Sequence, residues 1–153
     1  NLTSKKFITL SIISNNQVSK QIKELIKFNE LKIKIFEKVP NLNTKFFGNC
    51  DVVFSVGYLK KIESKIIENY EIINLHPSLL PKYKGLMTHK RMLINNEIKY
   101  GYSIHKVTKY LDDGEILSQN QQSISTSSEN ELSENHKRLE HQEVFKDLVN
   151  FLN

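Results

Sequence analysis

The chain has 153 residues and a net charge of +5, with 39% hydrophobic and 25% charged residues. These values favour one globular domain over residues 1–153 that buries its own core. No apolar run reaches the roughly 18–20 residues of a membrane span, and the first residues lack the layout of a signal peptide. The lone Cys50 excludes an internal disulfide and argues against a cysteine-based metal site, so we expect a cytoplasmic protein.

The positive charge alone would admit a nucleic-acid or other anionic partner. Lysine far outnumbers arginine, however, and the chain is rich in isoleucine and asparagine, a mixture typical of a codon bias towards A and T. Because no dense basic run occurs either, we do not expect a nucleic-acid partner.

Hydrophobic spacing predicts alternating strands and helices in the first half of the chain. The apolar run 51–56 is typical of a fully buried parallel strand, whereas 31–36 alternates apolar residues with lysine, as a half-exposed edge strand does. The remaining elements expected here are two strands over residues 7–13 and 71–75 and two helices over 17–29 and 59–70.

The second half continues this alternation. In chain order we expect a loop shaped by two prolines, a short helix, two strands, a second loop and a long amphipathic helix, over residues 76–85, 88–95, 100–107, 116–125, 125–131 and 131–152. The whole pattern predicts a Rossmann-like α/β fold, with a mostly parallel sheet and helices on both faces. Ligands of such folds bind beyond the carboxyl ends of the strands.

Two polar residues lie at the end of one predicted strand. Asn74 and His76 are two positions apart, so their side chains point to the same side, and Pro77 stiffens the exit from the strand. They are candidates for a pocket wall. In the structural alternative, Asn74 caps the turn and His76 is a satisfied surface residue.

A second group of candidates follows. Asp112 and Asp113 precede Gly114, a pattern that is also typical of a tight turn, and His105 lies on the preceding predicted strand. The other histidines have no metal-ligand spacing, so we expect no metal. The glycines are isolated and form no phosphate loop. The residues by themselves thus indicate a pocket and leave the reaction open.

The stretch INLHPSLLPKYKG, residues 73–85, closely resembles the signature of the formyltransferase family, which uses 10-formyltetrahydrofolate as donor. The match continues through THKR at 88–91 and GYSIHKVTKYLDDGEILSQ at 101–119, and CDVVFSVGYLKKI resembles the family's strand and folate-facing loop. Within the family, the order of these motifs is most similar to the glycinamide ribonucleotide formyltransferases of purine biosynthesis. The resemblance implies the formyltransferase fold and transfer of a formyl group to a small-molecule amine without a metal.

The resemblance also implies roles for particular residues. Asn74, His76 and Asp112 match the family's catalytic residues, and His105 matches the histidine that supports the aspartate. Positions that surround or read the pterin ring match Tyr58, Leu59, Lys60, Ile62, Val107, Thr108, Lys109, Tyr110 and Leu111. More weakly, a lysine and a glutamate that contact the glycinamide substrate resemble Lys137 and Glu140.

The chain departs from the family at its start. The purine-synthesis enzymes open with a strand and a glycine-rich loop that binds the substrate phosphate, and this chain has no such loop. Residues 8–16 resemble the family's second strand, which implies that the first strand is lacking; if 7–13 is the first strand instead, SNNQVSK replaces the loop. Three functions stay open: formylation of glycinamide ribonucleotide, formylation of an aminosugar nucleotide or methionyl-tRNA, and a truncated relative without catalysis.

Overall fold

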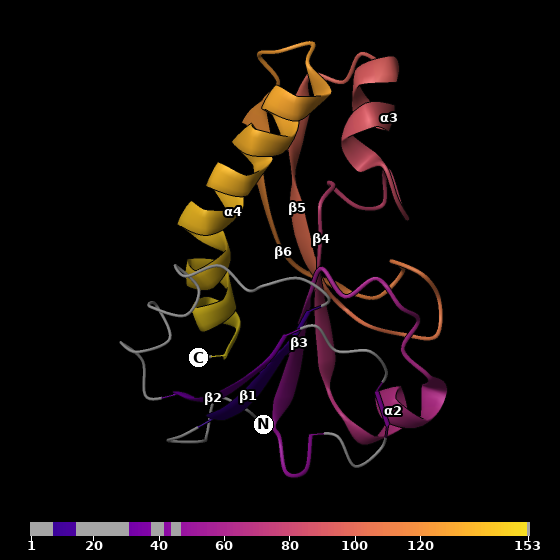
Figure 1. The fold of residues 1–153 in the computed structure, drawn as a ribbon, viewed down its shortest axis with the longest axis vertical. Helices are drawn as coiled ribbons and strands as arrows, with labels where there is room; N and C mark the ends of the chain where they lie inside the picture. The colour runs from indigo at the N-terminus through magenta and orange to yellow at the C-terminus, as the bar shows by residue number, and fades with distance from the viewer. Residues whose placement is uncertain (1–7, 15–30, 38–41, 44–46, 153) are drawn as a thin grey trace.

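The computed structural model describes residues 8–14, 31–37, 42–43 and 47–152. The predicted helix over 17–29 lies outside these residues. The described part of the chain contains six strands and three helices (Figure 1), namely β1 (Ile8–Ile13), β2 (Leu31–Phe36), β3 (Val52–Val56), α2 (Ser64–Asn69), β4 (Ile72–His76), α3 (Thr88–Ile94), β5 (Lys99–Lys106), β6 (Ile116–Ser123) and α4 (Glu129–Leu152).

The strands form one sheet in the order β2-β1-β3-β4-β5-β6. The first four run parallel, and β5 and β6 continue the sheet as antiparallel neighbours. The predicted mostly parallel α/β fold is therefore confirmed. The lysine-rich β2 is the edge strand that its alternation predicts, and β1 pairs with strands on both sides. That a preceding strand is lacking stays a prediction.

The central strands bury side chains on both faces of the sheet. On β3, Val52 and Phe54 pack into a cluster that includes Leu139 of α4, whereas Val53 packs into a second cluster with Ile66 of α2. Figure 1 shows α4 running along the length of the sheet. Because neighbouring residues of β3 point to opposite covered faces, the strand is apolar throughout, as the continuous run 52–56 predicted.

The helix predicted over 59–70 is wrong at its start, because α2 begins only at Ser64. Glu63 is extended, with ψ of 149°, and marks the boundary. A longer helix would place Lys60 and Lys61 near its positive N-terminal end, which disfavours cations. Residues 57–63 instead form a loop in which Leu59 is 72% exposed. This loop follows β3 at the carboxyl edge of the sheet.

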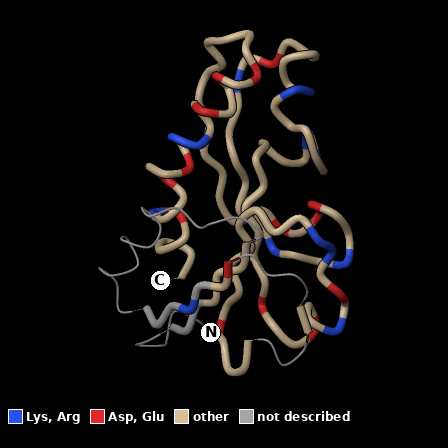
Figure 2. Tube along the Cα trace, viewed as in Figure 1, with Lys and Arg blue, Asp and Glu red and all other residues tan. Residues whose placement is uncertain are grey.

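Helix α4 begins two residues earlier than predicted because polar groups cap it. The Ser128 hydroxyl accepts a hydrogen bond from the Glu131 amide (3.3 Å), and the Thr126 hydroxyl donates to the Glu131 carboxylate (2.6 Å). Acidic and basic residues are interspersed along the helix (Figure 2). None of the helices that the structure describes combines the length and the apolar character that crossing a membrane requires.

Candidate active site

The site starts at the carboxyl end of β4. Asn74 and His76 lie on the same face of the strand, and the antiparallel register of β5 sets His105 directly opposite Asn74. The Asn74 amide nitrogen is 3.3 Å from Nε2 of His105. His76 and His105 are buried, so two elements distant in sequence bring three polar side chains together.

The contacts of His105 define its role in the site. Its Nδ1 lies 2.9 Å from the carbonyl of Lys106 and donates to it, so in the neutral ring Nε2 is an acceptor. Nε2 can then accept from the Asn74 amide, which orients that amide. The second hydrogen of the Asn74 amide remains available to a ligand.

A turn over residues 83–85 contacts His76 and Asp112 through its backbone. His76 donates from Nε2 to the carbonyl of Tyr83 (2.8 Å), and the amide of Gly85 donates to Oδ2 of Asp112 (2.8 Å). Tyr83 and Gly85 have φ of 57° and 84°, in the left-handed region. The sequence pattern gave no sign of these two backbone contacts.

Asp112 lies in the loop between β5 and β6, in the turn that Asp-Asp-Gly predicts, and its own φ is 48°. Aspartate tolerates this left-handed conformation better than most residues do. Its Oδ2 is 3.4 Å from Nδ1 of His76, and its Oδ1 is 3.6 Å from Nε2 of His105. The predicted group of Asn74, His76, Asp112 and His105 is thus assembled in one place.

The surroundings set the protonation of two of these groups. Burial raises the pKa of Asp112, but the neighbouring His105 and the hydrogen bond from the Gly85 amide outweigh it and hold that pKa below its ordinary value. Burial lowers the pKa of His76, and the opposing effects of the Tyr83 carbonyl and Asp112 do not restore it. At neutral pH the site therefore holds a carboxylate beside a neutral imidazole.

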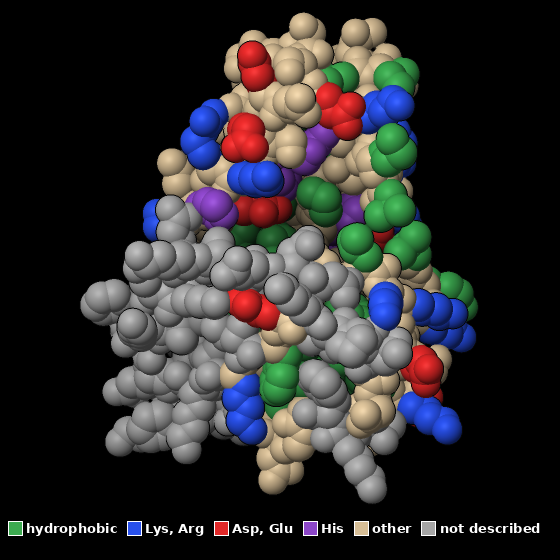
Figure 3. All heavy atoms as spheres, viewed as in Figure 1, with side chains coloured by type: hydrophobic (Ala, Val, Ile, Leu, Met, Phe, Trp, Pro, Cys, Tyr) green, Lys and Arg blue, Asp and Glu red, His purple; other side chains and the backbone are tan. Residues whose placement is uncertain are grey.

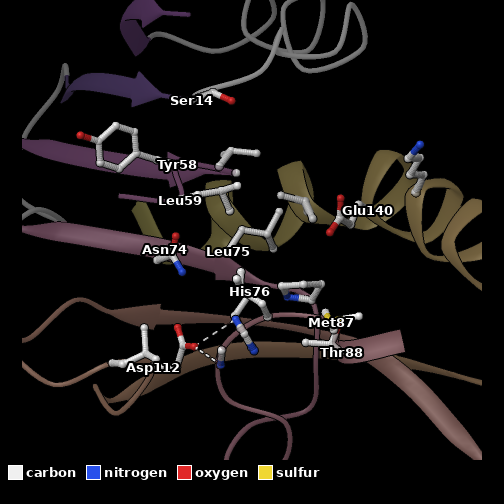
Figure 4. Close-up of a pocket in the computed structure, with 18 of the residues that line it drawn as sticks. Ser14, Tyr58, Leu59, Asn74, Leu75, His76, Met87, Thr88, Asp112 and Glu140 are labelled. Atoms are coloured by element: carbon white, nitrogen blue, oxygen red, sulfur yellow. Dashed lines mark hydrogen bonds and ion pairs between the residues drawn. The ribbon is translucent and has the colours of Figure 1, made fainter. Parts of the chain in front are cut away.

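These groups open into a pocket of about 640 Å³ (Figure 4). Figure 4 shows Asn74, His76 and Asp112 facing a common space, with Tyr58 and Leu59 on one side and Glu140 of α4 on another. The predicted site residues that line the pocket are Tyr58, Leu59, Asn74, His76, Leu111, Asp112, Lys137 and Glu140.

The structure does not bring the other predicted folate residues to the pocket wall. Ile62 and Val107 are partly buried against the cluster around Ile66. The other four are exposed loop residues outside the lining of the pocket, namely Lys60, Thr108, Lys109 and Tyr110. A role for these six in folate binding stays a prediction.

Helix α4 supplies the remaining charged side chains of the wall. Lys137 is 60% exposed and lies 3.5 Å from Glu134, whereas the Glu140 carboxylate is held at 2.6 Å by Nε2 of the buried His136. The His136 ring lies 4.7 Å from the ring of His89, centroid to centroid. Within the described ranges, no group of three histidine, cysteine or acidic side chains is arranged to hold a metal ion.

Some lining residues were not predicted. They come mainly from strand ends and from the segment before α3, namely Ser14, Val56, Gly57, Leu75, Pro77, Gly85, Leu86, Met87, Thr88, His141 and Val144. Leu86 and Met87 are exposed, and Figure 3 shows hydrophobic side chains gathered over α3 and the segment before it. The apolar pair Leu86–Met87, in a loop that is otherwise largely polar after Pro81, is the sequence sign that could have marked this rim.

Comparison with known proteins gives consistent results. The family described as Formyl transferase matches residues 16–149. Phosphoribosylglycinamide formyltransferase of Escherichia coli is 41% identical over 71 residues, which cover 45% of this chain and 34% of that protein. The bifunctional polymyxin resistance protein ArnA of Wigglesworthia glossinidia brevipalpis is 34% identical over 127 residues, 74% of this chain and 19% of that protein. Methionyl-tRNA formyltransferase of Fusobacterium nucleatum is 32% identical over 115 residues, 68% of this chain and 35% of that protein.

Solved structures share the fold. Phosphoribosylglycinamide formyltransferase of Campylobacter jejuni superposes with a TM-score of 0.76 at 19% identity, over 96% of this chain and 98% of that one. A sugar N-formyltransferase from Shewanella superposes with a TM-score of 0.78 at 22% identity, over 95% of this chain and 70% of that one. HypX of Aquifex aeolicus in complex with tetrahydrofolic acid superposes with a TM-score of 0.75 at 14% identity, over 94% of this chain and 26% of that one. The chain spans about a third or less of the curated relatives named above.

Proposed function

Because the chain belongs to the formyl transferase family, we propose that it transfers a formyl group from 10-formyltetrahydrofolate to the primary amine of glycinamide ribonucleotide, a step of purine biosynthesis. The observation that carries this proposal is the convergence of Asn74, His76 and Asp112 on one pocket. The acceptor rests on the 41% identity with the Escherichia coli enzyme over 71 residues.

The chemistry is acyl transfer between two nitrogen atoms. The neutral amine attacks the formyl carbon, the bond to N10 of the folate breaks, and one proton moves from the amine to N10. The tetrahedral intermediate carries an oxyanion, for which the free hydrogen of the Asn74 amide is a donor. Losing such a donor typically costs about 10²–10³ in rate.

His76 and Asp112 form a pair that can hold the proton in transit. The Asp112 carboxylate is the base towards the attacking amine, directly or through a water molecule. Nε2 of His76 is occupied by Tyr83, so the imidazole accepts a proton at Nδ1, 3.4 Å from Asp112. An imidazolium formed there is stabilised by the carboxylate and donates to the oxyanion or to N10.

The two substrates enter from different sides in this proposal. Tyr58, Leu59 and Leu111 offer apolar surface to the folate, and Leu59 and Leu111 are exposed at the mouth. The Aquifex aeolicus structure with tetrahydrofolic acid has the same fold and supports folate as the donor. Glu140 and Lys137 of α4 face the acceptor, where a carboxylate suits an amine and a lysine suits a phosphate.

A different acceptor is the second candidate. The relative named methionyl-tRNA formyltransferase aligns with 68% of this chain, more than the 45% aligned with the purine enzyme, and a sugar N-formyltransferase shares the fold. An aminosugar nucleotide or methionyl-tRNA would use the same Asn74, His76 and Asp112.

The test is a panel of acceptors. The purified chain is mixed with 10-formyltetrahydrofolate, and deformylation is followed with glycinamide ribonucleotide, an aminosugar nucleotide, methionyl-tRNA or no amine. Turnover that depends on glycinamide ribonucleotide is the expected result. Turnover with another amine would mean that the acceptor is wrong and that formyl transfer itself is right. Folate binding without any turnover would support a truncated relative that binds folate without catalysis.

A further inference from the structure

One peptide group in the turn before α3 contacts the site at one end and an arginine at the other. The Lys84–Gly85 peptide donates from the Gly85 amide to Oδ2 of Asp112 (2.8 Å). Its carbonyl, on Lys84, accepts a hydrogen bond of 2.6 Å from Nη2 of Arg91. Two hydrogen bonds in series therefore connect the Arg91 guanidinium to the Asp112 carboxylate through a single polarisable peptide group.

The guanidinium of Arg91 is fixed by this turn. It lies 5.5 Å from the centre of the Tyr83 ring, within reach of a cation–π contact. Its buried Nε has no hydrogen-bond partner among the residues that the structure describes. The Tyr83 hydroxyl donates to Glu97 (2.8 Å), so the ring beneath the guanidinium is itself held in place.

The turn that Arg91 holds also carries the carbonyl that accepts from His76. Tyr83 has a φ of 57°, a left-handed conformation that a residue other than glycine keeps only where contacts enforce it. Arg91 supplies one of these contacts from the last turn of α3, seven positions further along the chain.

We infer that Arg91 is a positioning residue for formyl transfer: it holds the 83–85 turn against His76 and Asp112 and polarises the Lys84–Gly85 peptide so that the Gly85 amide stabilises the Asp112 carboxylate. A hydrogen bond accepted by a peptide carbonyl strengthens the hydrogen bond that its amide donates, and a charged donor strengthens it most. Arg91 thus acts on Asp112 without touching it. This inference rests on the proposed function, because it assigns Asp112 as the base.

The direct test is a titration of the Asp112 carboxyl carbon by ¹³C NMR, with the resonance assigned from Asp112→Asn. The groups that face this carboxylate are His76 from β4, His105 from β5 and the Gly85 amide; Lys84 is paired with Asp113 at 2.5 Å. Arg91→Met keeps all of these groups and removes only the Arg91 charge, which also contributes to the lowered pKa of His76. The variant is expected to titrate at higher pH than the wild type, because its peptide is no longer polarised.

Activity gives a second readout. Arg91→Met is expected to lower kcat by about 10–10²-fold, the usual effect of a small displacement at a catalytic group, without changing KM for 10-formyltetrahydrofolate. The acid limb of the pH profile of kcat is expected to move to higher pH in this variant, because the base, Asp112, is protonated at higher pH. Arg91→Lys, whose ammonium can donate to the same carbonyl, recovers part of both effects. Arg138→Met is the matched control, because Arg138 is the chain's other arginine, is exposed, and is expected to leave both readouts unchanged.

The outcomes separate this inference from the proposed function. An unchanged Asp112 titration in Arg91→Met would overturn the role of Arg91, whether or not the chain is active. If Arg91→Met does not fold, Arg91→Gln, which keeps a neutral donor, is titrated in its place and is expected to shift in the same direction. A wild type without turnover would refute the proposed function, while the titration would still decide on Arg91.

Discussion

Gly114→Ala offers a test of how closely the Asp112 loop is fastened to the sheet. A Cβ added at Gly114 would lie 1.7 Å from the carbonyl oxygen of Lys106 and 2.7 Å from its carbon. Real Cβ atoms stay more than about 3 Å from such atoms, and both partners here are backbone. The loop must therefore move away from the end of β5 by more than about 1 Å.

The displacement has two expected costs. Opening this contact strains the hydrogen bond from the Lys106 amide to the Glu115 carbonyl (2.9 Å), which closes the loop. Overpacking of this kind lowers the free energy of unfolding by about 1–3 kcal/mol. Asp112 is two residues away, and a shift of about 1 Å at a catalytic group costs about 10²-fold in rate.

The measurements are urea unfolding and amine-dependent deformylation. Gly48→Ala is the control: an added Cβ has nothing within 4 Å, but φ is +57°, so it should cost about 1–2 kcal/mol of stability without loss of activity. Gly114→Ala should lose both stability and activity. A Gly114→Ala variant with wild-type kcat would refute the close docking of the loop and its control of Asp112.

Three further predictions concern single side chains. His76→Ala removes a proton acceptor and should lower kcat by about 10²–10⁴ in steady-state assays; a loss confined to KM would contradict its role. Tyr102→Phe removes a buried hydroxyl that donates to Asp147 of α4, and should cost about 1–2 kcal/mol in urea unfolding; an unchanged midpoint would argue against that bond. Burial lowers the pKa of His89 from 6.5 to about 4. In the unfolded chain His89 binds a proton at a higher pH than in the folded protein, so the free energy of unfolding of the wild type should fall between about pH 6.5 and 4. His89→Leu should lack this pH-dependent fall. The same pH dependence of the unfolding free energy in both proteins would contradict the prediction.

The sequence predicted the first five strands well, because these are short apolar or alternating runs; β6 (ILSQNQQS) is largely polar. It also placed Asn74 and His76 on one side of β4, since the period of two is a property of any strand. The start of α2 was predicted wrongly because the apolar spacing over 59–70 outweighed the two lysines at 60–61.

Other features of the site depend on contacts that no local pattern records. The antiparallel pairing of β5 with β4 sets His105 beside Asn74, across 31 positions of the chain. The amide of Gly85 acts through the backbone, so its residue type gives no sign of the bond to Asp112. The role of Asp112 came from the family resemblance, because Asp-Asp-Gly by itself predicts only the turn that is also present.

The most direct test of the account compares formyl transfer by Asp112→Asn and Asp113→Asn. The two changes are neighbours in one loop and chemically identical, but Asp112 faces His76 in the pocket while Asp113 is exposed and paired with Lys84. With 10-formyltetrahydrofolate and glycinamide ribonucleotide, we expect Asp112→Asn to lose about 10²–10⁴ in kcat and Asp113→Asn to stay near the wild type. Equal rates in the two variants would contradict the assignment of Asp112 as the base.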